Sequence, residues 1–189
     1  MIRSVTLSGS WAERVGASCS TVFAFEPGAN LLVGPNGCGK STILSAIVRV
    51  ARGTKDDDII IDADSGPIQS LDFESDNPRT LSYIQDNPRF QLASRFASHG
   101  ETTKAIINSM KNGVKEGAVV LLDEPDQALD LDGAQELVHA LGSGRFQSIV
   151  AAHHLALILL SDPSFNVIEL KRGYLKKVRK FMQKVLEGA

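Results

Sequence analysis

The 189-residue chain is poor in cysteine, in aromatic residues and in long apolar runs, and each shortage excludes a class of protein. Its two cysteines, Cys19 and Cys38, are too few for a disulfide framework, so a reduced, cytoplasmic setting is expected. The opening residues, MIRSVTLSGSW, lack the apolar core of a signal peptide. The apolar run LALILL at 155–160 is far too short to span a bilayer.

A strong excess of charge of one sign is also missing. The formal net charge is −2, which by itself favours neither nucleic acid nor membrane as a partner. The charge is unevenly spread, however, because seven of the 20 Lys and Arg residues lie in 171–189, where Glu187 is the sole acid. With 43% hydrophobic residues and this length, we expect one domain spanning residues 1–189 with a single sizeable core.

Short apolar runs separate segments with helical spacing. The pattern predicts strands at 2–7, 21–28, 31–34, 58–63, 67–74, 81–85, 118–125, 146–154 and 165–170, and helices at 40–51, 101–112, 133–141 and 174–187. Buried strands without alternation, interleaved with helices, favour a parallel α/β sheet. The strands before residue 30 and around 59–85 alternate more, which suggests an adjoining antiparallel sheet.

One segment between a predicted strand and a predicted helix fits the phosphate-loop pattern G-x-x-x-x-G-K-[ST]. It comprises Gly34, Pro35, Asn36, Gly37, Cys38, Gly39, Lys40 and Ser41, and Thr42 follows. Glycines let consecutive backbone N–H groups turn inward and bind an anion, and the helix directs its positive end to the same place. Lys40 can reach the β- and γ-phosphates of ATP, and the Ser41 hydroxyl can bind Mg²⁺.

Two acids follow the apolar run VVLL in the later part of the chain. Asp123 is placed to hold Mg²⁺ through water, and Glu124 to act as general base toward the attacking water. The simpler interpretation is a pair of solvated acids before Pro125, but the strand that leads to them is wholly apolar.

Together these motifs, GPNGCGKST and LLDEP, resemble those of the ATP-binding cassette (ABC) ATPase family. The resemblance implies a P-loop fold, a parallel sheet flanked by helices beside an antiparallel sheet, with ATP hydrolysis as the activity. It also implies a switch histidine, for which His153 is the candidate and His154 the alternative. A glutamine near the metal and the attacking water is assigned to Gln85, with Gln91 as the alternative.

The family's Ser-Gly-Gly signature has a partial match here. The segment Ala97-Ser98-His99-Gly100-Glu101 keeps Ser98 and Gly100, and it can equally be a helix cap with a Glu three residues after the Ser. In the family this segment binds the γ-phosphate held by a second protomer, so the resemblance implies a head-to-tail homodimer around two ATP molecules. Asp130, in Ala128-Leu129-Asp130, matches the loop that follows LLDEP.

The interval between Gln85 and Ser98 is only 13 positions. Transporter subunits of the family carry a several-helix subdomain there, which contacts the membrane partner. The opening of the chain is also similar to the heads of soluble ATPases of the SMC, RecF and overcoming-lysogenization-defect type. We therefore expect a soluble ATPase that acts on a partner protein in nucleic-acid repair, defence or assembly. The alternative is the motor subunit of an ABC membrane transporter.

Two features stay open. The helix at 174–187 places Leu175, Val178, Met182, Val185 and Leu186 near one face and cations on the rest. It can dock on the body of the protein, or it can contact a partner protein, nucleic acid or an anionic membrane. Trp11 or Arg14 could stack on adenine, or could serve only in the core or at the surface.

Overall fold

A computed structural model describes residues 1–188, apart from 73–113, 127–128, 154–156 and 159–162. The described elements are, in chain order, β1 (Ile2–Leu7), α1 (Gly9–Arg14), β2 (Thr21–Ala24), β3 (Ala29–Val33), α2 (Lys40–Ala51), β4 (Ile59–Ala63), β5 (Ile68–Asp72), β6 (Val119–Asp123), α5 (Leu131–Leu141), β7 (Gln147–Ala151), β8 (Asn166–Glu169) and α7 (Tyr174–Glu187). The predicted strand at 81–85 and helix at 101–112 lie outside the described residues.

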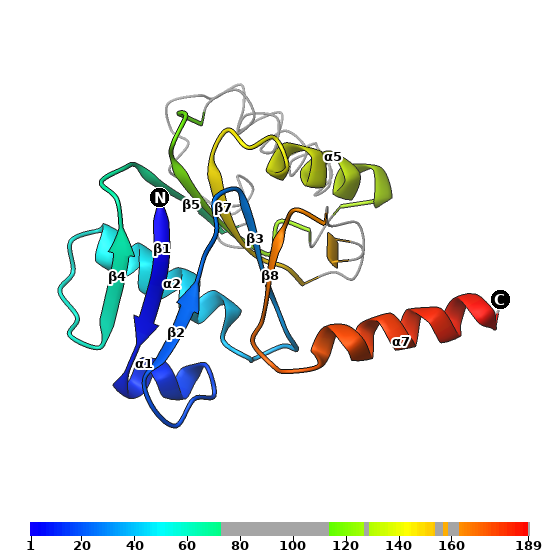
Figure 1. The fold of residues 1–189 in the computed structure, drawn as a ribbon, viewed down its shortest axis with the longest axis horizontal. Coiled ribbons are helices and arrows are strands. Elements are labelled where there is room, and N and C mark those ends of the chain that lie inside the picture. The colour runs from blue at the N-terminus through cyan, green and yellow to red at the C-terminus, as the bar shows by residue number, and fades with distance from the viewer. Residues whose placement is uncertain (73–113, 127–128, 154–156, 159–162, 189) are drawn as a thin grey trace, which may run out of the picture.

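The strands form the two expected sheets. Five parallel strands follow the order β5-β6-β7-β3-β8, and three antiparallel strands follow the order β2-β1-β4 (Figure 1). One placement differs from the prediction, because β5 pairs in parallel with β6 instead of joining the antiparallel sheet. β5 is the outermost of the described strands, and Gln69 and Ser70 are both exposed there, so its polar residues do not require an antiparallel neighbour.

The central strands of the parallel sheet are buried on both faces, which explains why their sequences do not alternate. Along β3, Leu31 and Val33 belong to a core cluster with α5, whereas Leu32 belongs to a second cluster with α2 and β1. Figure 1 shows α2 and α5 on opposite sides of the sheet. The sheet is therefore the middle layer, and its carboxyl-terminal edge is fixed from both sides.

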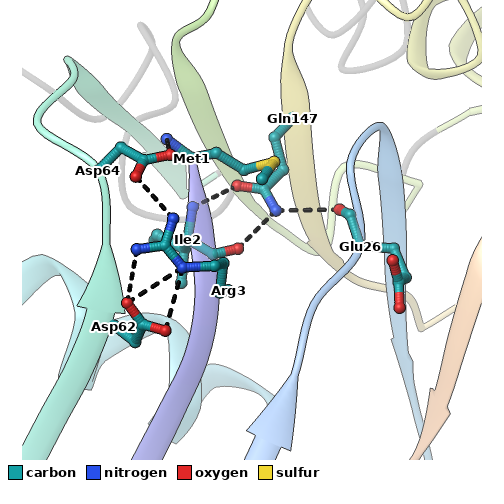
Figure 2. Close-up of polar contacts among 7 residues, drawn as sticks. All are labelled: Met1, Ile2, Arg3, Glu26, Asp62, Asp64 and Gln147. Carbon is teal, nitrogen blue, oxygen red and sulfur yellow. Dashed lines mark hydrogen bonds and ion pairs between the residues drawn. The ribbon is translucent and has the colours of Figure 1, made fainter.

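A buried glutamine joins the two sheets. The side chain of Gln147, at the start of β7, donates to the carbonyl of Ile2 over 2.7 Å and to that of Glu26 over 3.0 Å. Its Oε1 accepts from the Ile2 N–H over 2.7 Å (Figure 2). Backbone groups of β1 that would otherwise be buried without partners are satisfied in this way.

An exposed charge cluster lies beside this junction. Arg3 on β1 forms ion pairs with Asp62 on β4, over 2.7 Å, and with Asp64, over 2.6 Å (Figure 2). These hydrogen bonds from Arg3 hold the pKa of both carboxyl groups below its ordinary value, and they raise the pKa of the guanidinium. The cluster ties β4 to β1 at the edge of the antiparallel sheet.

Helix α7 has the predicted bounds and is amphipathic, but only its first half packs on the body. Tyr174 and Leu175 contact the core cluster of α5, and Val178 is buried. Phe181 and Val185 are 58% and 48% exposed, and Figure 1 shows the helix leaving the body toward the C-terminus. Among the described residues, no helix combines the length and apolar character that crossing a membrane requires.

Candidate functional site

The phosphate loop runs from the end of β3 to the start of α2, as predicted. Gly39 precedes the helix in a left-handed conformation, with φ of 97°, and no side chain caps this helix end. A Cβ at Gly39 would lie 2.7 Å from Val15 Cγ1 and 2.8 Å from Val15 Cα. Glycine is therefore required here twice, for the backbone conformation and for the close approach of the residue after α1. The loop leaves the positive end of α2 directed at its concave side.

Lys40 is almost fully buried, and its ammonium group folds back over the loop. Nζ donates to the carbonyl of Gly34 over 3.0 Å and to that of Pro35 over 3.4 Å. A buried cation needs such acceptors, and phosphate oxygens can take their place. The arrangement keeps one positive charge at the bend of the loop.

Ser41 and Asp123 are brought together from distant parts of the chain. The Ser41 hydroxyl, in the first turn of α2, donates to Asp123 Oδ1 over 3.0 Å. Asp123 is the last residue of β6, where it is half-buried. A hydroxyl and a carboxylate side by side are hard oxygen donors of the kind that Mg²⁺ prefers, and Mg²⁺ commonly takes only one or two such protein groups together with phosphate oxygens and water. The pair therefore fits the predicted ion.

Glu124 directly follows β6 and has an unusual backbone conformation. Its φ is 51°, in the left-handed region that non-glycine residues rarely adopt, at a cost of about 1–3 kcal/mol. Its N–H donates to the carbonyl of Ala151 over 3.1 Å, which anchors the residue to the end of β7. Strained residues of this kind concentrate at functional sites.

A cavity of about 290 Å³ lies between these groups. Its lining residues are Asn36, Gly37, Gly39, Lys40, Ser41, Thr42, Glu124 and His153. The structure thus brings Glu124 and His153 to the phosphate loop, as predicted, because the carboxyl ends of the parallel strands β3, β6 and β7 meet at one edge of the sheet.

A second cavity of about 360 Å³ adjoins the first on the other side of the loop. It is lined by Val15, Gly16, Pro35, Asn36, Gly37, Cys38, Leu170 and Lys171, so that Asn36 and Gly37 border both spaces. Trp11 and Arg14 line neither cavity. The indole N–H of Trp11 donates to Asp56 Oδ2 over 3.1 Å, and the Arg14 guanidinium lies 5.0 Å from the ring centre. The structure therefore favours the core and surface interpretation for this pair.

The first residues after LLDEP include one that sequence reasoning missed. Asp126 is 2% exposed, and its carboxylate oxygens accept from the His153 N–H over 3.3 and 3.4 Å. Its buried position depends on the pairing of β6 with β7, which no local pattern reveals. The signal available in the sequence was a third acid immediately after Asp123, Glu124 and Pro125.

Asp130 caps α5, since its carboxylate accepts from the Gly133 N–H over 2.8 Å. It does not line the 290 Å³ cavity, so its assignment to nucleotide binding across a dimer stays a prediction. Several other assignments lie outside the described residues: Gln85, Gln91, Ala97, Ser98, His99, Gly100, Glu101, Ala128 and His154.

Comparisons with known proteins agree with this geometry. A family model described as "AAA domain" matches residues 15–177. A curated relative is the mycobactin import ATP-binding/permease protein IrtB of Mycolicibacterium smegmatis, 29% identical over an alignment of 185 residues. That alignment covers 74% of this chain and 32% of the relative, so the chain spans about a third of the length of IrtB.

Three solved structures share the fold. The first is a nucleotide-free ATP-binding cassette from an ABC transporter (TM-score 0.57, 13% identity), which covers 95% of this chain and 96% of the cassette. The second is the SMC head domain from Thermotoga maritima, with a TM-score of 0.54 and 16% identity, which covers 85% of this chain and 92% of the head domain. The third is the dimeric cassette MJ0796 bound to ADP and Pi, with a TM-score of 0.51 and 17% identity, which covers 91% of this chain and 94% of the cassette. At these identities the likeness concerns the fold alone, which is that of ABC cassettes and SMC heads.

Proposed function

The chain belongs to the AAA domain family, and on that premise we propose that it binds ATP with Mg²⁺ and hydrolyses it. The observation that carries the proposal is the meeting of Lys40, Ser41 and Glu124 around one cavity, with Asp123 hydrogen-bonded to Ser41. A phosphate-binding loop alone would support binding; an acid beside it supports hydrolysis.

In the proposed reaction, the loop N–H groups and Lys40 hold the β- and γ-phosphates. Ser41 and Asp123 would hold Mg²⁺, which when bound supplies positive charge beside the phosphate oxygens. Glu124 orients a water molecule and accepts its proton as the water oxygen attacks the γ-phosphorus. The bond to the β,γ-bridging oxygen breaks, and ADP and inorganic phosphate leave. His153, on the same cavity, is assigned to the γ-phosphate side.

The base and ribose are assigned to the 360 Å³ cavity. It borders the phosphate loop through Asn36 and Gly37, and Val15 and Leu170 give it an apolar lining on which a flat ring can rest. Trp11 has no part in this assignment, since its indole contacts Asp56 and Arg14.

The test is the substitution Glu124→Gln, which keeps the shape of the side chain and removes the base. We expect hydrolysis to fall by a factor of at least about 10², while a fluorescent ATP analogue with Mg²⁺ binds as in the wild type. Glu136→Gln, at an exposed acid on α5, is the matched control. Failure of the wild-type chain to bind the analogue at high protein concentration would overturn the proposal.

We further propose that two chains close head-to-tail over two ATP molecules, with Ser98, Gly100 and Asp130 of one chain meeting the nucleotide of the other. The similar cassette MJ0796 is described as dimeric with ADP and Pi bound, which supports this arrangement by analogy of fold. Light scattering measures the mass of the Glu124→Gln variant in solution, and with ATP and Mg²⁺ present we expect the mass of a dimer. A monomer at every concentration contradicts the sandwich.

The proposed task is to drive a conformational change in a partner, in nucleic-acid repair, defence or assembly. The short Gln85–Ser98 interval supports a soluble machine. The alternative, a transporter motor, is favoured by the likeness to a protein whose name includes "permease". Affinity purification with the Glu124→Gln variant from the native host tests the alternative, which a co-purifying membrane protein would support. A separate assay of the wild-type chain tests the first, which stimulation of its ATPase activity by DNA would support.

A further inference from the structure

The chain segments at the ends of β6 and β7 are hydrogen-bonded to each other at two points beside the 290 Å³ cavity. The Glu124 N–H donates to the carbonyl of Ala151 over 3.1 Å. Two residues farther along each loop, the His153 N–H donates to the carboxylate of Asp126 over 3.3 and 3.4 Å. The main chain at Glu124 and the main chain at His153 therefore constrain each other.

Asp126 makes the second of these contacts from a buried position. Only 2% of its surface is exposed, and burial of a carboxylate is costly unless hydrogen bonds compensate for the lost water. Asp126 is not among the residues that line the cavity. Its neighbour across the contact, His153, is exposed and does line the cavity.

We propose that Asp126 is a positioning residue that holds the main chain at His153, so that the histidine side chain faces the phosphate cavity opposite Glu124. The inference rests on the proposed ATPase function and adds a residue to it. Residue 153 lies two positions beyond the end of β7, outside the ladder that fixes Ala151. The Asp126 carboxylate supplies, from the neighbouring loop, an acceptor that the strand no longer provides.

Loss of this acceptor should cost catalysis more than binding. The phosphate loop and Lys40 hold the ground-state phosphates without Asp126, whereas His153 must be in place when the γ-phosphate is transferred. Small displacements of such groups lower the rate strongly, because the reacting geometry is demanding. We therefore expect Asp126→Ala to lower kcat about tenfold, with an unchanged dissociation constant for a fluorescent ATP analogue with Mg²⁺. Asp126→Asn keeps an acceptor oxygen and should retain most of the wild-type kcat.

Asp126 takes part in at least one further polar interaction, so a single substitution does not isolate its effect on His153. A double-mutant cycle does. The variants are Asp126→Ala, His153→Ala and the pair together, with Asp57→Ala, at an exposed loop acid, as the control for removal of a negative charge. If the inference is right, Asp126→Ala lowers kcat about tenfold in the wild-type background, where His153 is present. In the His153→Ala background the same substitution lowers kcat by less than about twofold.

A second measurement is independent of turnover. Amide hydrogen exchange at His153 should be at least about tenfold faster in Asp126→Ala than in the wild type, because the N–H has lost its buried acceptor. If the alanine variant does not fold, Asp126→Ser, whose hydroxyl is shorter than the carboxylate, replaces it in the cycle.

The inference is overturned if Asp126→Ala lowers kcat equally in the wild-type and His153→Ala backgrounds, or if exchange at the His153 amide is unchanged. In either case the proposed function still stands, provided that the wild-type chain hydrolyses ATP. Absence of hydrolysis in the wild type is a different outcome, which overturns the proposed function and this inference with it.

Discussion

The hydroxyl of Ser41 donates a hydrogen bond to the carboxylate of Asp123 over 3.0 Å, although 82 positions separate the two residues. The contact joins the first turn of α2 to the last residue of β6. Both oxygens are thus already in place for a shared cation, and binding requires little rearrangement of the protein there.

Ser41→Ala removes one of the two oxygens and should weaken the Mg²⁺-dependent part of nucleotide binding by about tenfold or more. Binding of the analogue in EDTA should hardly change, because the loop and Lys40 remain. A Mg²⁺ titration of fluorescent-analogue binding measures both. Ser45→Ala is the matched control, because Ser45 is on the same helix and equally exposed but does not line the 290 Å³ cavity. Equal Mg²⁺ dependence in the two variants would contradict the assignment of Ser41.

Gly39→Ala should destabilise the fold and abolish nucleotide binding. Alanine must adopt a φ of 97° and overlap Val15, which together should cost more than about 2 kcal/mol. Gly53→Ala is the control, since Gly53 has a φ of 80° but its added Cβ meets nothing within 4 Å. This control should lose only about 1 kcal/mol and keep binding. Urea denaturation and analogue titration of both variants measure the difference, and similar behaviour of the two would show that the close approach to Val15 is unimportant.

The ion pairs of Arg3 should make stability fall in acid. The pKa values of Asp62 and Asp64 are lowered in the folded protein, so the folded state binds fewer protons than the unfolded chain near pH 4. The stabilisation is present above the unfolded pKa of about 4 and disappears as the pH falls through the folded values. Thermal unfolding measured across pH 2–7 should show a shallower acid decline for Arg3→Ala than for the wild type. Parallel profiles would exclude a contribution from the cluster.

Nucleotide binding should leave the emission of Trp11, the chain's one tryptophan, unchanged. The indole is fixed by Asp56 and covered by Arg14, and it lines neither cavity. Fluorescence spectra with and without ATP and Mg²⁺ test this directly. Asp56→Ala should shift the spectrum, because the indole loses its acceptor, and this shift shows that the probe responds. A nucleotide-induced shift of the Trp11 emission in the wild type would instead support contact between Trp11 and the nucleotide.

Much of this site could be predicted from local patterns. The phosphate loop, the acids after VVLL and the strand that leads to His153 are each specified by a continuous stretch whose spacing suits one backbone geometry. The placement of β5 could not be predicted in the same way, since a short, partly polar strand suits the exposed side of a parallel sheet as well as an antiparallel pair. Asp126 was missed for a related reason, because its burial depends on a neighbour 27 positions away.

Strand β7 carries a polar anchor at each end. At its start, the Gln147 side chain is hydrogen-bonded to the backbone of β1 in the antiparallel sheet (Figure 2). Just past its other end, His153 lines the phosphate cavity. Five buried residues in register between β6 and β3 leave such a strand little freedom to bend. Strand β7 is therefore a direct mechanical connection between the edge of the phosphate site and the backbone of the antiparallel sheet.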